Sequence, residues 1–275
     1  MNLKNITPQE VKKMSYNELI GLTKETNRPP GGATTIMKIA QHTFLNKDKK
    51  VLEVGTSTGF TAVELASLTQ ASIHAIDINP VSLEEAEKRA KTYHVDHHIQ
   101  FEKQDVTTLP YENNYFDLAF IGNVFSLVSD ADKAFSECNR VLKKSGFLAA
   151  VPMYYTREPS QKLLDDVSQA IQVKVSALKK DYWTSFFNRA PFKVCFAQDY
   201  QFDIISSNKV EQFVENICAR EHLKELSSET MDTLKIIYRD YMQLFKENLA
   251  HMGFTILVLQ KEVEYDEELF TATKI

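Results

Sequence analysis

Three carboxylates and one amide occupy comparable places along the first half of the chain. Glu53, Asp77, Asp105 and Asn123 each stand at or just after the end of a short apolar run. If these runs are parallel strands, their carboxyl ends meet at one edge of a sheet, which is where open α/β sheets bind ligands. Carboxylate and amide oxygens accept hydrogen bonds from hydroxyl and amino groups. The sequence therefore predicts a ligand site at this edge.

The turn after the first apolar run limits what that edge can hold. Residues 53–59 read Glu-Val-Gly-Thr-Ser-Thr-Gly, with glycines only at Gly55 and Gly59. Ser57 stands where a GxGxxG turn would place the central glycine that lets the backbone approach a pyrophosphate. The turn also lacks the Gly-Lys-Ser/Thr sequence of a phosphate-binding P-loop. A dinucleotide or a nucleoside triphosphate is therefore a disfavoured ligand.

Strand-like and helix-like patterns alternate around this turn. Asn79 and Pro80 are typical of a helix start, and Gly146 is expected to end a helix. We expect strands at residues 51–54, 73–78, 99–103, 116–121 and 147–152, and helices at residues 33–45, 60–68, 80–93 and 130–144. Such an alternation indicates right-handed crossovers and a parallel sheet that is covered on both faces. Residues 33–152 are therefore expected to form a doubly wound α/β unit.

The segments on either side of this unit have a different pattern. Residues 1–26 look helical, and the Pro-Pro-Gly-Gly sequence at residues 29–32 ends any helix. After Pro152 we expect helices at 159–174, 209–221 and 228–251, and strands at 192–202 and 254–259. The expected organisation is one domain over residues 1–275, made of a helical N-terminal flap (1–32), the α/β core (33–152), a cap with the sixth strand (153–250) and the last strand (251–262).

Composition and charge exclude several classes of protein. The net charge of −5 and the isoelectric point near 5.9 leave no broad basic field for a polyphosphate, so nucleic acid is not expected as a partner. Cys138, Cys195 and Cys218 fit neither a disulfide framework nor a zinc knuckle, and no metal is expected. The N-terminus lacks a signal-peptide pattern and no apolar stretch is long enough to span a membrane. We therefore expect a cytoplasmic protein, as a monomer or a homodimer.

The order of these motifs resembles that of the class I S-adenosylmethionine-dependent methyltransferases. Residues 51–60 resemble the family's first motif, in which an acid, any residue and a glycine precede a turn of small residues that ends in glycine. Further agreements follow in order at Asp77 and at residues 104–106, 116–123 and 142–148. The resemblance covers about residues 51–153 and departs from the family pattern at Ser57. It implies a Rossmann-like, mostly parallel seven-stranded sheet with an antiparallel last strand, and S-adenosyl-L-methionine as the cofactor.

The resemblance also implies a role for each residue at the edge. The cofactor's carboxylate would meet amides at the start of the helix after Gly59, where the helix dipole is positive, and Glu53 would neutralise its ammonium group. Asp77 would accept the ribose hydroxyls, Ile78 would lie against adenine, and the carbonyls of residues 122–123 would face the transferring methyl group. Asp105 would accept from the adenine amino group, while the amide of Val106 would donate to a ring nitrogen. The cofactor-binding set is then Glu53, Gly55, Thr56, Ser57, Gly59, Asp77, Ile78, Asp105, Val106 and Asn123.

Several of these roles have a structural alternative. Asp77 could cap the next helix, Glu53 could be satisfied by amides of the turn, and Asp105 could be an ordinary turn residue. The three hydroxyl residues 56–58 could cap the following helix, with or without contact to a ligand.

Residues beyond this edge are candidates for the acceptor side of the site. Tyr154 and Tyr155, directly after the fifth strand, are the best-placed candidates for a catalytic base or orienting group. Arg28 lies in a loop that could bind an anion or clamp the cofactor, or only connect two helices. The ring-rich stretch at residues 182–202 is interpreted mainly as core, with Tyr182 and Trp183 as candidates for a lid over the acceptor.

The sequence thus predicts methyl transfer to a small molecule by in-line displacement, for which positioning provides most of the catalysis. A large cap without a basic stripe favours a small acceptor. Two alternatives stay open. One is a peptide or protein methyltransferase, in which an acidic patch at residues 165–166 or 211–215 receives a cationic peptide. The other is a cofactor-binding scaffold without turnover.

Overall fold

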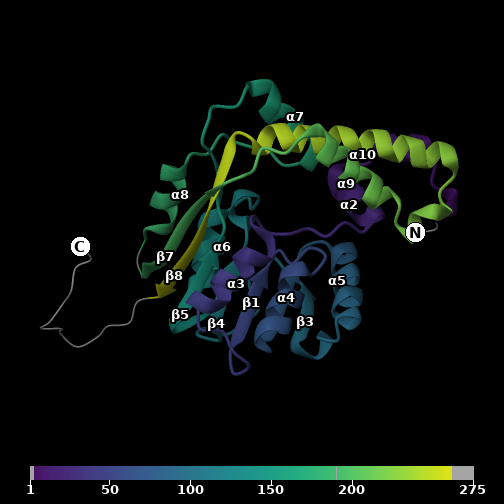
Figure 1. The fold of residues 1–275 in the computed structure, drawn as a ribbon. Coiled ribbons are helices and arrows are strands. Elements are labelled where there is room, and N and C mark those ends of the chain that lie inside the picture. Colours follow the sequence, from purple (N-terminus) through teal and green to yellow (C-terminus); the bar gives the residue numbers. More distant parts are fainter. Residues whose placement is uncertain (1–2, 190, 262–275) are drawn as a thin grey trace, which may run out of the picture.

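A mixed sheet forms the centre of the structure (Figure 1). The computed structural model describes residues 3–189 and 191–261. The strands are β1 (Lys50–Val54), β2 (Ser72–Asp77), β3 (Ile99–Lys103), β4 (Phe116–Ile121), β5 (Leu142–Ala150), β6 (Met153–Tyr155), β7 (Phe192–Gln201) and β8 (Met252–Lys261). Their order is β3-β2-β1-β4-β5-β8-β6, and β7 also pairs with β8. The five strands from β3 to β5 are parallel, and β8 is antiparallel to its three partners.

Strand β8 closes the sheet. Residues 257–260 pair with β5 and residues 252–254 with β6, whereas β7 pairs along residues 253–261 and so occupies the opposite side of β8. The expected doubly wound, mostly parallel sheet with an antiparallel last strand is confirmed. The expected number of seven strands is wrong by one, because the fifth strand is interrupted at Pro152, which has no amide hydrogen for the ladder.

Helices cover both faces of the sheet. One face carries α3 (Gly32–His42), α4 (Phe60–Thr69) and α5 (Pro80–Thr92), and the other carries α6 (Ala131–Val141) and α8 (Lys180–Phe187). Side chains alternate between faces along a strand, so Val51 packs on the α3–α4 side and Leu52 on the α6–α8 side. Glu53 has the same parity as Val51 and therefore belongs to the α3–α4 side.

A layer of helices lies above the carboxyl ends of the parallel strands (Figure 1). It contains α1 (Pro8–Lys13), α2 (Tyr16–Thr23), α7 (Gln161–Ile171), α9 (Ser207–Cys218) and α10 (Ser228–Leu249). Val11 and Leu19 from the N-terminal helices share an apolar cluster with Val214, Leu234 and Tyr238 from α9 and α10. The expected N-terminal flap thus shares one core with α9 and α10, whereas α8 of the expected cap packs on the sheet.

The end of α6 differs from the expectation. The helix ends at Val141 and β5 begins at Leu142, so Gly146 lies inside a strand and does not stop the helix. The left-handed residue of this segment is Ser145, with φ 60°. Gly146 is needed for close packing, because a Cβ there would lie 2.9 Å from the Lys143 carbonyl oxygen.

Within the described residues, no helix has both the length and the apolar character that a membrane crossing requires.

Gly59 is predicted to limit stability through the packing of α4 on α5. Its φ is +78°, and an added Cβ would lie 2.8 Å from the Ala86 Cβ. We expect Gly59→Ala to lower the free energy of unfolding by about 2 kcal/mol or more without any ligand, from left-handed strain and overpacking. Gly21→Ala is the matched control, since it lies in α2 with nothing within 4 Å of its added Cβ. Urea unfolding measures the free energy of unfolding of each variant. Equal decreases for Gly59→Ala and Gly21→Ala would contradict the prediction.

Candidate functional site

The turn between β1 and α4 is held against the end of β2. The amides of Gly55 and Thr56 both donate to the Ile76 carbonyl oxygen, at 2.8 and 3.0 Å. The amide of Ser57 donates to Asp77 Oδ2 at 2.9 Å. The carboxylate at the end of β2 therefore fixes the shape of the turn at the end of β1.

Ser57 adopts the backbone conformation that a glycine would supply. Its φ is 48°, in the left-handed region, between Gly55 at 75° and Gly59 at 78°. None of the three hydroxyl residues at 56–58 caps α4, because the N-cap is Gly59 and it has no side-chain cap. Ser57 thus differs from the family pattern in residue type, but the backbone keeps the left-handed conformation of the turn.

Glu53 is buried at the end of β1, and one of its carboxyl oxygens is unpaired. The residue is 2% exposed, and neither Glu53 Oε2 nor Thr56 Oγ1 has a hydrogen-bond partner within 3.5 Å among the described residues. Burial raises the pKa of Glu53 to about 8; the adjacent Thr56 side chain acts against this rise, and the nearby charge of Asp77 adds to it. The structural alternative, in which amides of the turn satisfy both oxygens of Glu53, is not realised. An unpaired buried carboxyl is unfavourable, so this oxygen is suited to receive a donor from a ligand.

Asp77 retains capacity for a ligand. Its Oδ1 accepts from the Asn79 amide at 2.8 Å, while Asn79 itself caps α5 through its side chain. Each oxygen of Asp77 thus accepts one amide, and a carboxylate has room for about four donors. Ile78 follows at the edge and is 70% exposed, which leaves an apolar surface beside the carboxylate.

The predicted residues after β3 and β4 are already engaged within the chain. Asp105 Oδ1 accepts from both the amide and the hydroxyl of Thr107 at 2.8 Å, and these hydrogen bonds lower the pKa of Asp105. Asp105 is exposed and Val106 is buried. Asn123 Oδ1 accepts from the Met153 amide at 3.1 Å and so joins the end of β4 to β6.

The carbonyls of residues 122–123 each accept a hydrogen bond within the chain. Gly122 accepts from the Val151 amide at 2.7 Å, and the Asn123 carbonyl accepts from the Ser126 hydroxyl at 2.7 Å. Both are used by the fold itself, because the strand ladder and the turn after β4 need acceptors at these positions. Gly55 contacts this turn, since an added Cβ there would clash with the Val124 side chain.

Two helix starts near the turn lack side-chain caps. Among the ten described α-helices, seven begin with a Ser, Thr, Asn or Asp whose side chain accepts a backbone amide. By contrast, α3 and α4 begin after Gly31 and Gly59, at φ 77° and 78°, with no side-chain cap. The Arg28 guanidinium lies 5.0 Å from the ring centroid of Phe60, the first residue of α4. Uncapped amides beside an arginine make this a favourable place for an anion.

The loop before α3 lies on the turn. Asn27 donates to the Ser57 hydroxyl at 3.3 Å and to the Thr58 hydroxyl at 3.4 Å. Arg89 of α5 donates to the Thr58 carbonyl at 2.8 Å and to the Thr26 hydroxyl at 2.9 Å.

The same loop is anchored to the helical layer. Glu25 accepts hydrogen bonds from the hydroxyls of Tyr16 and Tyr238, and burial raises the pKa of Glu25. The turn is therefore connected to α10 through the N-terminal loop.

The predicted acceptor-side tyrosines are buried. Tyr154 and Tyr155 are 5% and 3% exposed, and their hydroxyls donate to Asp199 at 3.3 Å and Asn248 at 2.7 Å. Burial raises the pKa of both, which opposes the phenolate form that a catalytic base needs.

Trp183 is part of the core and does not form a lid. It is 3% exposed, its Nε1 donates to the Met153 carbonyl at 2.8 Å, and it stacks on Phe187. Tyr182 is 45% exposed, with its ring 5.0 Å from that of Trp183. The amphipathic pattern of α8 directs Trp183 inward and Tyr182 outward.

The acidic segments that could have received a peptide are paired locally. Asp166 lies 2.5 Å from Lys162, Glu211 lies 2.7 Å from Arg239 and Glu215 lies 2.7 Å from Lys235. Neighbouring cations thus offset much of the negative charge that the sequence suggested.

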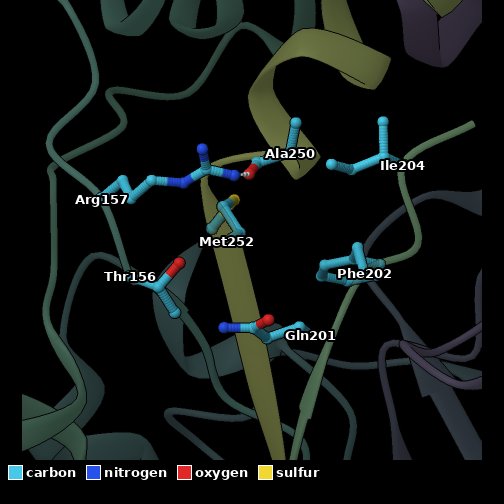
Figure 2. A pocket seen from close by; sticks show the side chains of 7 residues that line it. All are labelled: Thr156, Arg157, Gln201, Phe202, Ile204, Ala250 and Met252. Carbon is cyan, nitrogen blue, oxygen red and sulfur yellow. Dashed lines mark hydrogen bonds between the residues drawn. The ribbon is translucent and has the colours of Figure 1, made fainter.

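A cavity of about 260 Å³ was missed by the sequence reasoning (Figure 2). Arg157, Phe202, Ile204 and Met252 contribute to its walls, so it joins residues after β6 and β7 to the start of β8. These side chains come from three distant segments of the chain. In the sequence, the one indication of this cavity was that residues 156–157 come shortly after the expected fifth strand, directly behind β6.

Comparisons with known proteins agree with this geometry. The protein family described as "Methyltransferase domain" matches residues 52–150. An uncharacterized protein of Haemophilus influenzae is 30% identical over 66% of the chain and 72% of its own length. The uncharacterized methyltransferase YodH of Bacillus subtilis is 24% identical over 87% of the chain and 97% of its own length. A sterol 24-C-methyltransferase of Candida albicans is 26% identical over 60% of the chain and 44% of its own length.

Solved structures show the same fold. The crystal structure of MccD protein has a TM-score of 0.72 at 24% identity and covers 86% of this chain and all of its own. The [4+2]-cyclase SpnF has a TM-score of 0.67 at 20% identity, covering 94% and 97%. A phosphoethanolamine-type N-methyltransferase of Haemonchus contortus, in complex with phosphomonomethylethanolamine and S-adenosylhomocysteine, has a TM-score of 0.65 at 17% identity, covering 94% and 59%.

The unpaired carboxyl of Glu53 predicts a pH-dependent cost to stability. Its pKa is about 8 in the folded chain against an ordinary value of 4.5, so the folded state holds the proton more tightly than the unfolded state. This contribution is favourable below about pH 4.5 and is lost as the pH rises towards 8, by up to about 1.4 kcal/mol per pH unit. We expect Glu53→Gln to be more stable than the natural chain at pH 8, by a margin that shrinks towards pH 5.

Urea unfolding from pH 5 to 8 without ligand measures this margin. Glu84→Gln, on the exposed side of α5, is the matched control. A Glu53→Gln margin that does not change with pH would show that Glu53 already has a partner in the folded protein.

Proposed function

The chain belongs to the class I S-adenosylmethionine-dependent methyltransferases, and from this premise we propose that it methylates a small-molecule acceptor bound beneath the helical layer. The observation that carries the proposal is the buried, unpaired Glu53 at the carboxyl end of β1. A site that needs no cation would gain stability by replacing this carboxyl with an apolar side chain.

The residues around the turn fit the cofactor's functional groups. Glu53 is suited to neutralise the amino group, and its raised pKa requires it to lose a proton when it does so at neutral pH. The uncapped amides at the start of α4, beside Arg28, are suited to the carboxylate. Asp77 can accept hydroxyls, and exposed Ile78 offers an apolar surface for the base. S-adenosylmethionine would supply an activated methyl group: the acceptor atom bonds to the methyl carbon in line as the bond from that carbon to the sulfonium sulfur breaks, and S-adenosylhomocysteine leaves.

Positioning is the main catalytic contribution of the chain in this proposal. The loop at residues 25–28 covers the turn and, through Glu25 and Tyr238, is held to α10. Tyr154 and Tyr155 serve as positioning residues, because their hydroxyls hold β6 to β7 and α10. The acceptor atom is accordingly one that needs no tyrosinate base.

Three observations favour a small acceptor. The helical layer packs above the site, and the acidic segments 165–166 and 211–215 are largely paired with cations. Similar proteins bear the names of small-molecule methyltransferases, including sterol and ubiquinone/menaquinone enzymes. Because a cyclase shares the fold, methyl transfer itself must be measured.

Asp77 is predicted to be needed for cofactor affinity. We expect Asp77→Ala to weaken S-adenosylhomocysteine at least about tenfold in calorimetry, because the ribose loses a charged acceptor and the turn loses its tie through Ser57. The affinity of Asp77→Asn, which keeps one acceptor oxygen, should lie between that of the natural chain and that of Asp77→Ala. Asp96→Ala, exposed at the opposite edge of the sheet, is the control. Unchanged affinity in Asp77→Ala would remove Asp77 from the site.

The acceptor class is tested by following an isotope-labelled methyl group. Purified protein and labelled S-adenosylmethionine are incubated with the small-molecule fraction and with the macromolecular fraction of a cell extract, and the products are analysed by mass spectrometry. We expect a methylated product in the small-molecule fraction, and less of it with Asp77→Ala. Label in protein alone would favour the peptide alternative, and cofactor binding without any labelled product would favour a scaffold.

A further inference from the structure

Two hollows adjoin each other beside the end of α10. The first is the cavity of about 260 Å³ in Figure 2, and the second has a volume of about 470 Å³. Ile204 and Ala250 line both of them. We call the pair the α10 groove.

The α10 groove combines an apolar wall with one arginine, Arg157. Phe202, Ile204, Leu244 and Met252 supply the apolar part. Figure 2 shows the Arg157 guanidinium directed at the Ala250 carbonyl, to which Nη2 donates at 2.6 Å. An arginine has five donors in a fixed fork, so this bond leaves others able to hold an anion.

The other part of the groove is of mixed charge. Lys246 lines it and donates to the Ser207 hydroxyl at 3.0 Å, and exposed Glu247 lies beside it. The basic group beside the first cavity is therefore Arg157.

The groove lies along the same edge as the cofactor residues. The ring centroids of Phe202 and Phe254 are 5.1 Å apart. The Phe254 ring in turn lies next to Gly31, since a Cβ added to Gly31 would be 3.2 Å from it. The apolar wall therefore reaches the start of α3. On the other side, Met153 is bonded to Asn123, and three residues of extended chain, about 10 Å, separate it from Thr156 at the cavity.

We propose that the α10 groove binds the acceptor of the methyl group, and that this acceptor is an elongated apolar molecule with a carboxylate or phosphate that pairs with Arg157. The apolar wall receives the body of the molecule. The reacting atom lies towards the end of β4. This inference rests on the proposed function, because it names the acceptor class of that same site.

Binding of simple probes tests the proposal without turnover. Calorimetry compares decanoate and decyl phosphate with decan-1-ol and decyltrimethylammonium, which share the chain and differ in charge. We expect both anions to bind more tightly than the alcohol and the cation. Arg157→Gln should weaken both anions about tenfold and leave decan-1-ol unchanged, because only the charged pair is lost. Ile204→Asp should weaken the alcohol as well as the anions.

Controls separate this proposal from the proposed function. Lys193→Gln, a basic position at the far end of β7, should change none of the probe affinities. Every variant should bind S-adenosylhomocysteine as the natural chain does.

If Arg157→Gln lowers the affinities for decanoate and decan-1-ol equally, Arg157 supports the shape of the groove and does not bind the anion. That result would overturn the proposal. Failure of all probes while S-adenosylhomocysteine still binds would also overturn it and leave the proposed function intact. Probe binding without S-adenosylhomocysteine binding would support the groove and contradict the proposed function.

Discussion

The burial of one unpaired carboxyl group at the end of β1 is the constraint on which the site depends. Strand alternation places Glu53 on the side covered by α3 and α4, where water cannot solvate it. Desolvation raises its pKa to about 8, and the folded chain supplies no partner for Oε2. Such an arrangement lowers stability unless a ligand completes it. In the proposed function, the cationic amino group of S-adenosylmethionine is that complement.

The neighbouring elements place further polar groups close to Glu53. The turn at residues 55–59 is pulled onto β2 by Ile76 and Asp77, which brings two carboxyl groups to one edge. Two helix starts leave their first amides without side-chain caps. The loop at residues 25–28 contacts the turn and is tied to α10 through Glu25. The loop thus joins the turn at the sheet edge to the helical layer above it.

Local patterns in the sequence predicted most of the fold, because local forces decide them. The period of apolar residues located the strands and helices, and Asn79 caps α5 as its side chain predicts. Gly146 misled the prediction because pairing of β5 with β4 and β8 overrides a local helix-stop signal. The short strand β6 depends on the interruption at Pro152 and on pairing with a strand about a hundred residues later.

The site was predictable where the motif is contiguous and less so where distant segments meet. Asp77 at the end of β2 contacts the turn that follows Glu53, which is the proximity that the motif predicted. The packing of Val11 and Leu19 against α9 and α10, the burial of Trp183 and the α10 groove depend on long-range contacts that no short spacing encodes. Tyr154 and Tyr155 stand at the expected place, but burial rather than position decides their protonation.

A crystal structure grown with S-adenosylhomocysteine tests the central claim most directly. The account predicts density across the carboxyl ends of β1, β2 and β3, with the amino group within hydrogen-bond distance of Glu53 Oε2 and the ribose hydroxyls at Asp77. Density elsewhere, or a bound ligand whose amino group leaves Glu53 unpaired, would contradict it.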